Sequence, residues 1–254
     1  MIHPTAIIHP RAQLGSGCEI GPYCVIGEHV TLGDKCKLHS HVVIDGHTKL
    51  GVGNEIFPFA SIGLKTQDLK WKGGVTRTEI GDHNTFREYV SIHSATGDGG
   101  VTVVGSQNHV LAYSHIAHDC RIGSHIIMSN AATLAGHVIV EDYAIISISA
   151  VHQFCRIGKL AMIGGCSKVV QDVPPFMIAD GNPAETRTVN KVGLERNGFS
   201  DAAQTALRQA YKIIFREGLT VSNALIKIEA ELPALPEVKY LVEFIRASER
   251  GICK

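Results

Sequence analysis

The chain has 254 residues and seven cysteines, and its 24 Lys and Arg residues balance its 24 Asp and Glu residues. A formal charge of zero excludes a global attraction to nucleic acid or to an anionic membrane. No apolar run reaches the length of a membrane span, and Met1 leads directly into the repeat described below. We therefore expect a chain without signal peptide or membrane span that resides in the cytoplasm.

Aliphatic residues return at every sixth position from the N-terminus. The series is Ile2, Ile8, Leu14, Ile20, Ile26, Leu32, Leu38, Ile44, Leu50, Ile56 and Ile62. A six-residue unit is too short for a helical repeat, and an alternating strand would show a period of two. The period therefore predicts a mainly β fold, a parallel β-solenoid in which each repeat is one short strand and one turn.

The repeat predicts a β-helix over residues 1–189, with two external loops near 63–79 and 93–103. A solenoid tolerates insertions only where they leave its surface, and such loops often carry binding residues. The first loop is thus either a binding loop or a solvated turn. The second, which contains Thr96-Gly97-Asp98-Gly99-Gly100, is interpreted as a flexible excursion.

One step of five residues, from Ile146 to Val151, interrupts the six-residue spacing. We expect a local bend or a tightened turn to absorb it, with a possible shift of the nearby Gln153. The pattern ends at Pro174-Pro175, because proline removes a donor from the strand ladder and would stop a strand.

From residue 190 to 254 the apolar spacing becomes helical, which predicts a C-terminal α-helical domain. Ser200 is a suitable N-cap for a helix from about Asp201 to Arg216. Further helices are predicted from about Val221 to Leu232 and from about Pro236 to Arg250. We expect these helices to cap the open end of the solenoid.

Most of the cysteines occupy the small position four residues after a repeat aliphatic. They are Cys18, Cys24, Cys36, Cys120 and Cys155. This position predicts compact interior packing, and the repeat context together with the odd total of cysteines favours reduced thiols.

Three of the 14 histidines, His115, His118 and His137, fall within one short region, whereas most of the others are scattered over turns. If three six-residue repeats make one coil, residues eighteen apart stack in neighbouring coils. His118, Gly136 and, after the five-residue step, Gln153 should therefore form one column along an edge. We expect His115 and His137 to lie near it.

This column contains the minimum set of chemical groups that base-assisted acyl transfer requires. An imidazole can accept a proton near neutral pH, Asp119 can orient it, and the backbone N–H of Gly136 can bind an oxyanion. Two other interpretations remain open: the histidines only fill turns, or neutral imidazoles on adjacent coils hold zinc. The metal interpretation is weaker, since no cysteine joins the cluster from a turn position.

Five blocks of sequence follow one another along the chain. They are Gln67-Asp68-Leu69-Lys70, His115-Ile116-Ala117-His118-Asp119-Cys120, Leu134-Ala135-Gly136-His137-Val138, Ala150-Val151-His152-Gln153-Phe154-Cys155 and Gln171-Asp172-Val173-Pro174-Pro175. In this order they resemble the UDP-N-acetylglucosamine O-acyltransferase family, which opens lipid A biosynthesis in Gram-negative bacteria. The resemblance extends over nearly the whole chain, including Gly181-Asn182-Pro183 and the helical tail. Hexapeptide repeats alone would identify only a broad superfamily.

The resemblance implies a left-handed parallel β-helix with three flat faces, an exception to the usual right-handed crossover. It also implies a homotrimer with active sites in the clefts between subunits. Such an enzyme would move an (R)-3-hydroxyacyl chain from acyl carrier protein to the 3-position of UDP-N-acetylglucosamine or its 3-amino analogue, without a cofactor or metal. Another hexapeptide acyl- or acetyltransferase and a zinc carbonic-anhydrase-like trimer are the alternatives.

By the same resemblance, His118 would be the general base, Asp119 would orient it, and the Gly136 amide would bind the oxyanion during direct attack on the thioester. The residues implied in substrate binding are Asp68, Lys70, His115, His137, Gln153, Asn190 and Arg196. Gly165 would set the length of the acyl chain.

Two positions depart from the family. Arg196 is followed by Asn197 where relatives often have consecutive basic residues, so one phosphate contact would be missing. Val192 is apolar where relatives can be acidic, so it cannot bind a ribose hydroxyl. Basic patches, for example around Lys191 and Arg196, would meet the acidic surface of the carrier protein.

Overall fold

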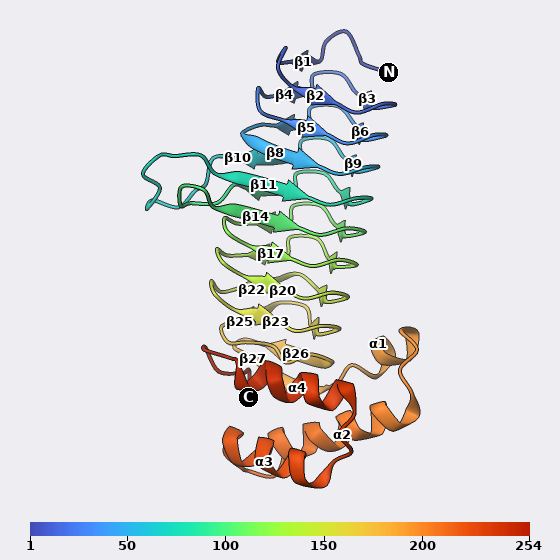
Figure 1. Cartoon of the computed structure of the whole chain (residues 1–254), viewed down its shortest axis with the longest axis vertical. Helices are drawn as coiled ribbons and strands as arrows, with labels where there is room; N and C mark the ends of the chain where they lie inside the picture. The colour runs from blue at the N-terminus through green and yellow to red at the C-terminus, as the bar shows by residue number, and fades with distance from the viewer.

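The computed structural model describes residues 1–254 and shows a tall triangular column of short strands, with helices at the C-terminal end (Figure 1). Three sheets form the faces of the column. The first sheet consists, in order, of β1 (Ile7–Ile8), β4 (Val25–Ile26), β7 (Val43–Ile44), β10 (Ser61–Leu64), β13 (Ser91–His93), β16 (His115–Ile116), β19 (Thr133–Leu134), β22 (Ser149–Val151) and β25 (Ser167–Val169). All of its strands run parallel.

The other two faces repeat this arrangement. The second sheet consists of β2 (Gln13–Leu14), β5 (Thr31–Leu32), β8 (His47–Leu50), β11 (Arg77–Ile80), β14 (Val101–Val104), β17 (Arg121–Ile122), β20 (Ile139–Val140) and β23 (Arg156–Ile157). The third sheet consists of β3 (Glu19–Ile20), β6 (Lys37–Leu38), β9 (Glu55–Ile56), β12 (Thr85–Phe86), β15 (His109–Val110), β18 (Ile127–Met128), β21 (Ile145–Ile146), β24 (Met162–Ile163), β26 (Met177–Gly181) and β27 (Ala184–Val189). We call the edge from the first to the second sheet the first edge, and the edge from the third back to the first sheet the third edge.

The strand register confirms the predicted coil of three repeats. Ile7 pairs with Val25, and His115 pairs with Thr133, so each coil takes eighteen residues. The five-residue step shortens one turn, at residues 147–148 on the third edge, and pairing continues with Thr133 opposite Ala150. The predicted tightened turn is therefore confirmed, and it lies on a different edge from Gln153.

From Ile20 onward the repeat aliphatics are buried and belong to one continuous core of 41 residues, against which the partly buried Ile8 and Leu14 pack. The five cysteines of the repeat are part of this core, and all seven cysteines of the chain are free thiols. Cys18, Cys24, Cys36 and Cys120 each donate from Sγ to a carbonyl of the next coil, as in the 2.8 Å bond from Cys24 to the oxygen of His39. Burial raises the pKa of Cys120 to about 12, which keeps this thiol protonated and unreactive.

The six-residue pattern ends at Pro174-Pro175 as predicted, but the prolines do not stop the sheet, which continues to Val189. Both prolines lie before β26, whose Ile178 pairs with Met162 of β24, and β26 then turns into the antiparallel strand β27. A proline stops pairing only at its own position, so the sheet resumes where the backbone donors return. The sequence pattern gave no signal for this hairpin, because the aliphatic residues of the hairpin do not follow the six-residue spacing.

The C-terminal region contains α1 (Lys191–Arg196), α2 (Asp201–Phe215), α3 (Val221–Glu231) and α4 (Pro236–Arg246). The predicted N-cap is confirmed, since Ser200 Oγ accepts a 3.2 Å bond from the amide of Ala203. The last three helices agree with the prediction except that α4 ends at Arg246 rather than near Arg250. The chain beyond α4 returns to the column, where Arg250 donates to the carbonyl of Val170 at 3.1 Å and Ile252 bridges to Asp172. α1 was not predicted.

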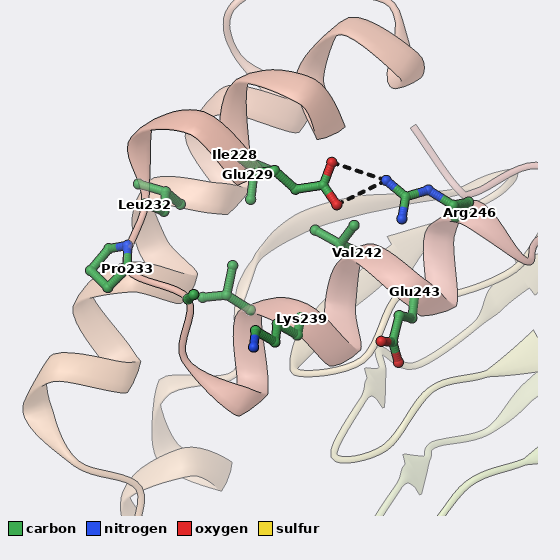
Figure 2. Close-up of a pocket in the computed structure, with 10 residues that line it drawn as sticks. Ile228, Glu229, Leu232, Pro233, Lys239, Val242, Glu243 and Arg246 are labelled. Atoms are coloured by element: carbon green, nitrogen blue, oxygen red, sulfur yellow. Dashed lines mark hydrogen bonds and ion pairs between the residues drawn. The ribbon is translucent and has the colours of Figure 1, made fainter.

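The helices form a second core of 20 buried residues that includes Leu160 and Phe176 of the column, so they cover its open end. Within this cap, an ion pair with two 3.0 Å contacts joins Glu229 of α3 to Arg246 of α4 beside a small hollow (Figure 2). Between cap and column, Tyr240 of α4 donates to the Glu141 carboxylate. None of the helices has the length and apolar character needed to cross a membrane.

Candidate active site

The first edge collects most of the residues that the sequence singles out. Asp119, His137 and Phe154 occupy the same turn position in three successive coils, with φ angles of 60°, 60° and 64°. His118 and Gly136 directly precede the first two of them. Each turn places its residue in the left-handed region, so the side chains stack along the edge as predicted from the eighteen-residue spacing.

His118 and Asp119 form a dyad. The Nδ1 atom of His118 lies 2.8 Å from Oδ2 of Asp119. An ionised carboxylate only accepts hydrogen bonds, so Nδ1 carries the proton and Nε2 keeps its lone pair. Asp119 is itself fixed, because Oδ2 accepts a 3.1 Å bond from the amide of Thr96 and its own amide donates to Thr102 Oγ1 at 2.9 Å. The dyad is therefore a base held in one tautomer and one orientation.

Gly136 lies next to the ring of His118, one coil further along. A Cβ at position 136 would be 2.3 Å from Cε1 and 2.4 Å from Nε2 of His118, closer than real Cβ contacts. The Gly136 amide donates to no group of the chain. A free N–H beside a basic nitrogen can bind negative charge that develops on a substrate oxygen.

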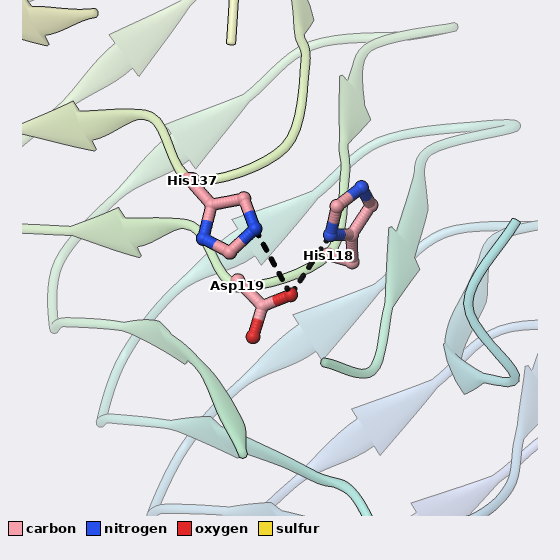
Figure 3. A group of neighbouring side chains, drawn as sticks. All are labelled: His118, Asp119 and His137. Carbon is pink, nitrogen blue, oxygen red and sulfur yellow. Dashed lines mark hydrogen bonds and ion pairs between the residues drawn. The ribbon is translucent and has the colours of Figure 1, made fainter. Parts of the chain in front are cut away.

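His137 packs against both residues of the dyad. Its Nε2 lies 3.7 Å from Asp119 Oδ2, and its ring meets the ring of His118 edge-on at 5.2 Å (Figure 3). On its other side it stacks on Phe154 with 4.7 Å between ring centroids. The stacking keeps His137 half-exposed and fixed at the rim of the site.

The loop between β10 and β11 reaches back to the dyad. Asp68 Oδ2 lies 3.9 Å from Nε2 of His118, too far for a hydrogen bond but close enough to flank a group bound there. The amide of Lys70 donates to Asp68 Oδ1 at 3.0 Å; this bond, together with the nearby His118, keeps the pKa of Asp68 below its ordinary value. Of the two interpretations of this loop, its position favours the binding loop.

These side chains surround a hollow of about 470 Å³, which we call the first hollow. It is lined by Asp68, Lys70, Thr96, Gly97, His118, Asp119, His137, Gln153 and Phe154. Gln153, which the five-residue step could have displaced, lies in the lining.

His115 does not line the first hollow. It projects from β16, where Nδ1 lies 2.7 Å from Ser91 Oγ and the ring meets His93 edge-on at 5.2 Å. Burial, with the neighbouring imidazoles of His93 and His118, lowers the pKa of His115 to about 4, and burial lowers that of His93 as well. Both rings are therefore neutral at physiological pH. His93 was not among the predicted residues.

Asn190 and Arg196 lie in a different place. They line a hollow of about 680 Å³ between α1 and the third sheet, which we call the second hollow. Asn190 caps α1, since its Oδ1 accepts a 3.0 Å bond from Gly193 and its Nδ2 donates to the Leu160 carbonyl at 2.9 Å. Gly165 lies on the third edge, where an added Cβ would meet only Ile148, at 3.8 Å.

Sequence reasoning missed three residues around the dyad: Thr96, Thr102 and Phe154. Phe154 could have been found, because it occupies the same turn position in its coil as Asp119 and His137 do in the two preceding coils. Thr96 could not, because its loop has no repeat register. That loop, interpreted as a flexible excursion, also contributes to the site, since the Thr96 amide donates to Asp119 and Thr96 lines the first hollow.

The ligand atoms of His118, Asp119 and His137 lie within 4.8 Å of one another, so the three side chains could hold a metal ion (Figure 3). A metal bound at Nδ1 of His118 would replace the proton that now joins this nitrogen to Asp119. The 2.8 Å separation of His118 Nδ1 and Asp119 Oδ2 is that of a hydrogen bond, and a metal ion at Nδ1 would break this bond.

The fold and the sequence match known proteins over their whole length. The family model "Udp N-acetylglucosamine O-acyltransferase; Domain 2" matches residues 172–253, and a bacterial hexapeptide transferase model matches residues 1–34 and 11–46. The structure of LpxA, a UDP-N-acetylglucosamine acyltransferase from Bacteroides fragilis, is 44% identical with a TM-score of 0.98, and both chains are fully covered. LpxA from Acinetobacter baumannii is 47% identical with a TM-score of 0.96, over 100% of this chain and 99% of that one. The chain belongs to the UDP-N-acetylglucosamine acyltransferase family.

A third relative, the UDP-N-acetylglucosamine O-acyltransferase of Moraxella catarrhalis, is 42% identical with a TM-score of 0.94 and covers 100% of this chain and 99% of its own. Membership in the UDP-N-acetylglucosamine acyltransferase family confirms the resemblance inferred from the five sequence blocks, and with it the class of left-handed parallel β-helix and an acyltransferase activity.

Proposed function

We propose that the protein transfers an (R)-3-hydroxyacyl chain from acyl carrier protein to the 3-position of UDP-N-acetylglucosamine, or of its 3-amino analogue, as the first step of lipid A biosynthesis. The observation that carries the proposal is the His118–Asp119 dyad beside the free amide of Gly136, in a chain of this family. A fixed base next to a free N–H donor is the pair of groups that acyl transfer requires.

In the proposed reaction His118 Nε2 accepts the proton of the sugar hydroxyl or amine while that oxygen or nitrogen attacks the thioester carbonyl. The charge that develops on the carbonyl oxygen is stabilised by the Gly136 N–H. Asp119 stabilises the imidazolium through the Nδ1 bond of 2.8 Å. Collapse of the intermediate expels the carrier thiolate, which takes the proton back from His118.

Direct attack, without an acyl-enzyme, is supported by the lining of the first hollow. It contains no serine or cysteine, and its only hydroxyl, that of Thr96, is bonded to Thr66 Oγ1 at 3.1 Å. Cys120 is nearby in sequence but is buried in the core. In the proposed reaction, the acceptor hydroxyl or amine is therefore itself the nucleophile.

The two hollows support a homotrimer. Asp68, Lys70, His137 and Gln153 would hold the sugar and acyl groups in the first hollow, whereas Asn190 and Arg196, in the second hollow, would hold the nucleotide phosphates. In the proposed trimer, the second hollow of one subunit would face the first hollow of the next, so that each site would use two chains. His115 would help to shape the same cleft, and Gly165 would limit the acyl chain.

The decisive experiment is incubation of the protein with 3-hydroxyacyl carrier protein and each UDP-sugar in turn. Replacement of His118 by Ala is expected to lower the turnover by about 10²–10⁴-fold, because a general base is removed. His3→Ala, at an exposed imidazole far along the column, serves as the control and should retain full turnover. Intact turnover in His118→Ala would show that the assigned base is wrong.

The same assay separates the alternatives. Turnover with acetyl-CoA but not with the acyl carrier protein would indicate another hexapeptide acetyltransferase. The clustered ligand atoms of His118, Asp119 and His137 are the one observation that favours a zinc carbonic-anhydrase-like function. Metal analysis of the purified protein together with a CO₂ hydration assay tests it. The free thiols of the chain suit a reducing compartment, so we propose that the enzyme acts in the cytoplasm.

A further inference from the structure

Two loops leave the column next to each other and bond to one another. The first loop, residues 65–76, connects β10 to β11, and the second loop, residues 94–100, connects β13 to β14 (Figure 1). The amide of Val75 donates to Asp98 Oδ1 at 2.7 Å, and the amide of Gly99 donates to the carbonyl of Val75 at 2.8 Å. Neither loop contains a strand, so bonds between the loops decide where their residues lie relative to the dyad.

Thr66 is a buried residue at the start of the first loop, with 4% of its surface exposed. Its Oγ1 accepts a 3.1 Å bond from the amide of Asp68 and lies 3.1 Å from Oγ1 of Thr96 in the second loop. A hydroxyl group accepts hydrogen bonds and also has one proton to donate, so Thr66 can accept from the Asp68 amide and give its own proton to Thr96. This one hydroxyl therefore bonds to both loops.

Thr96 continues this chain of hydrogen bonds to the dyad. Its amide donates to Asp119 Oδ2 at 3.1 Å, and the same oxygen lies 2.8 Å from His118 Nδ1. At the other ring nitrogen, Asp68 Oδ2 lies 3.9 Å from Nε2 of His118. The two aspartates that flank the imidazole are thus connected to each other through Thr66 and Thr96.

We propose that Thr66 is a positioning residue, whose hydroxyl sets where the Asp68 carboxylate lies relative to the His118–Asp119 dyad. The inference rests on the proposed function, in which Asp68 binds the acceptor sugar and His118 accepts its proton, and it names the group that holds these two residues in place. Without the hydroxyl, the Asp68 amide loses its acceptor and the Thr96 hydroxyl loses its partner at the same time. A displacement of about 1 Å between a bound substrate and the groups that act on it can cost roughly 10²-fold in rate.

Thr66→Val tests the proposal, because valine keeps the branched shape of the side chain and lacks only the hydroxyl. We expect kcat/KM for the UDP-sugar to fall by about 10- to 100-fold, with a rise in KM, because the sugar is no longer held at the lone pair of His118 Nε2. A fraction of unfolded protein would lower the apparent kcat but leave KM unchanged, so the rise in KM separates positioning from stability. Thr66→Ser retains a hydroxyl and should keep the original KM. An unchanged KM in Thr66→Val, or an equal rise in Thr66→Ser, would overturn the proposal.

Thr76→Val is the matched control. Thr76 Oγ1 donates to Ser94 Oγ at 3.1 Å, so this threonine also joins the two loops through hydroxyl groups, but neither of these side chains bonds to Asp68 or Asp119. Its KM should stay at the original value. A rise in KM equal to that of Thr66→Val would show that the general attachment of the loops matters rather than Thr66, which would contradict the proposal.

Amide hydrogen exchange measures the same link without substrate. In Thr66→Val the amides of Asp68 and Thr96 should exchange faster, the first because its acceptor is gone and the second because the Thr96 side chain is released, whereas Thr76→Val should leave both rates unchanged. Faster exchange at both amides in a protein inactive on UDP-sugars would uphold the link while contradicting the proposed function. Unchanged exchange at Thr96 in Thr66→Val would overturn the proposal whatever the turnover.

Discussion

The imidazole of His118 lies so close to Gly136 that no side chain fits between them. An added Cβ would be 2.3 Å from Cε1 and 2.4 Å from Nε2 of the ring, and its nearest neighbours are all atoms of that ring. The ring would therefore have to move, while the backbone could stay. Glycine at position 136 is therefore required by the position of the His118 ring.

Gly136→Ala is accordingly expected to lower kcat by about 10²-fold or more, because it displaces the proposed general base and crowds the proposed donor for the oxyanion. The melting temperature should change little, since the clash falls on a side chain at the rim of a hollow. Steady-state kinetics and a thermal melt of the same sample measure both effects. A variant with normal kcat would show that His118 need not lie over residue 136.

Asp119→Asn should weaken the base without removing it. The amide can still bond to His118 Nδ1, but it no longer stabilises the imidazolium, so kcat is expected to fall by about 10- to 100-fold. Because both residues act as one unit, adding this change to His118→Ala should cost almost nothing further. Additive losses in that double-mutant cycle would mean that Asp119 acts independently of His118.

The buried imidazole of His115 predicts a loss of stability in acid. Its pKa is about 4 in the folded chain against an ordinary 6.5, so between these two values the unfolded state binds more protons. The free energy of unfolding should fall as the pH drops from 6.5 to about 4, by no more than about 1.4 kcal/mol per pH unit for this residue. Urea titrations across this range should give a flatter profile for His115→Gln, whereas His83→Gln, at an exposed turn, should keep the original slope.

Tyr240 should contribute more to stability than an exposed ion pair of the cap. Its hydroxyl donates to the Glu141 carboxylate, which also accepts from the Lys159 amide at 2.9 Å and pairs with Arg156 at 3.2 Å. Burial and this bond hold the pKa of Tyr240 above its ordinary value. Tyr240→Phe removes one hydrogen-bond donor from the Glu141 carboxylate, and we expect this to lower the free energy of unfolding by about 1.5–3 kcal/mol.

Arg246→Ala provides the comparison for Tyr240→Phe. Its pair with Glu229 is half-exposed on both sides, so its loss should cost less than about 1 kcal/mol. Denaturant unfolding of the two variants in one buffer ranks the contacts. The reverse order would indicate that the cap is held to the column by packing alone.

The spacing of aliphatic residues was sufficient to predict the column and, once three repeats are taken to make one coil, the neighbourhood of His118 and Gly136. These features follow from a local rule, since each repeat adds the same strand and turn and residues one coil apart must stack. The same rule failed where the register stops. It gave no signal for the hairpin of β26 and β27, for α1, or for the early end of α4, where the chain leaves the helix to pair with Asp172.

By itself, the sequence determined that the chain is a hexapeptide β-helix with a helical cap and that a histidine, an aspartate and a glycine meet on one edge, because periodic side chains fix a periodic backbone. Only the tertiary structure decided what surrounds them. Thr96 and Asp68 reach the dyad from loops without a repeat, His115 turns to Ser91 instead of the first hollow, and Asn190 lies in the second hollow. Such placements depend on how irregular segments fold against the column, and their contacts are between residues that no sequence spacing relates.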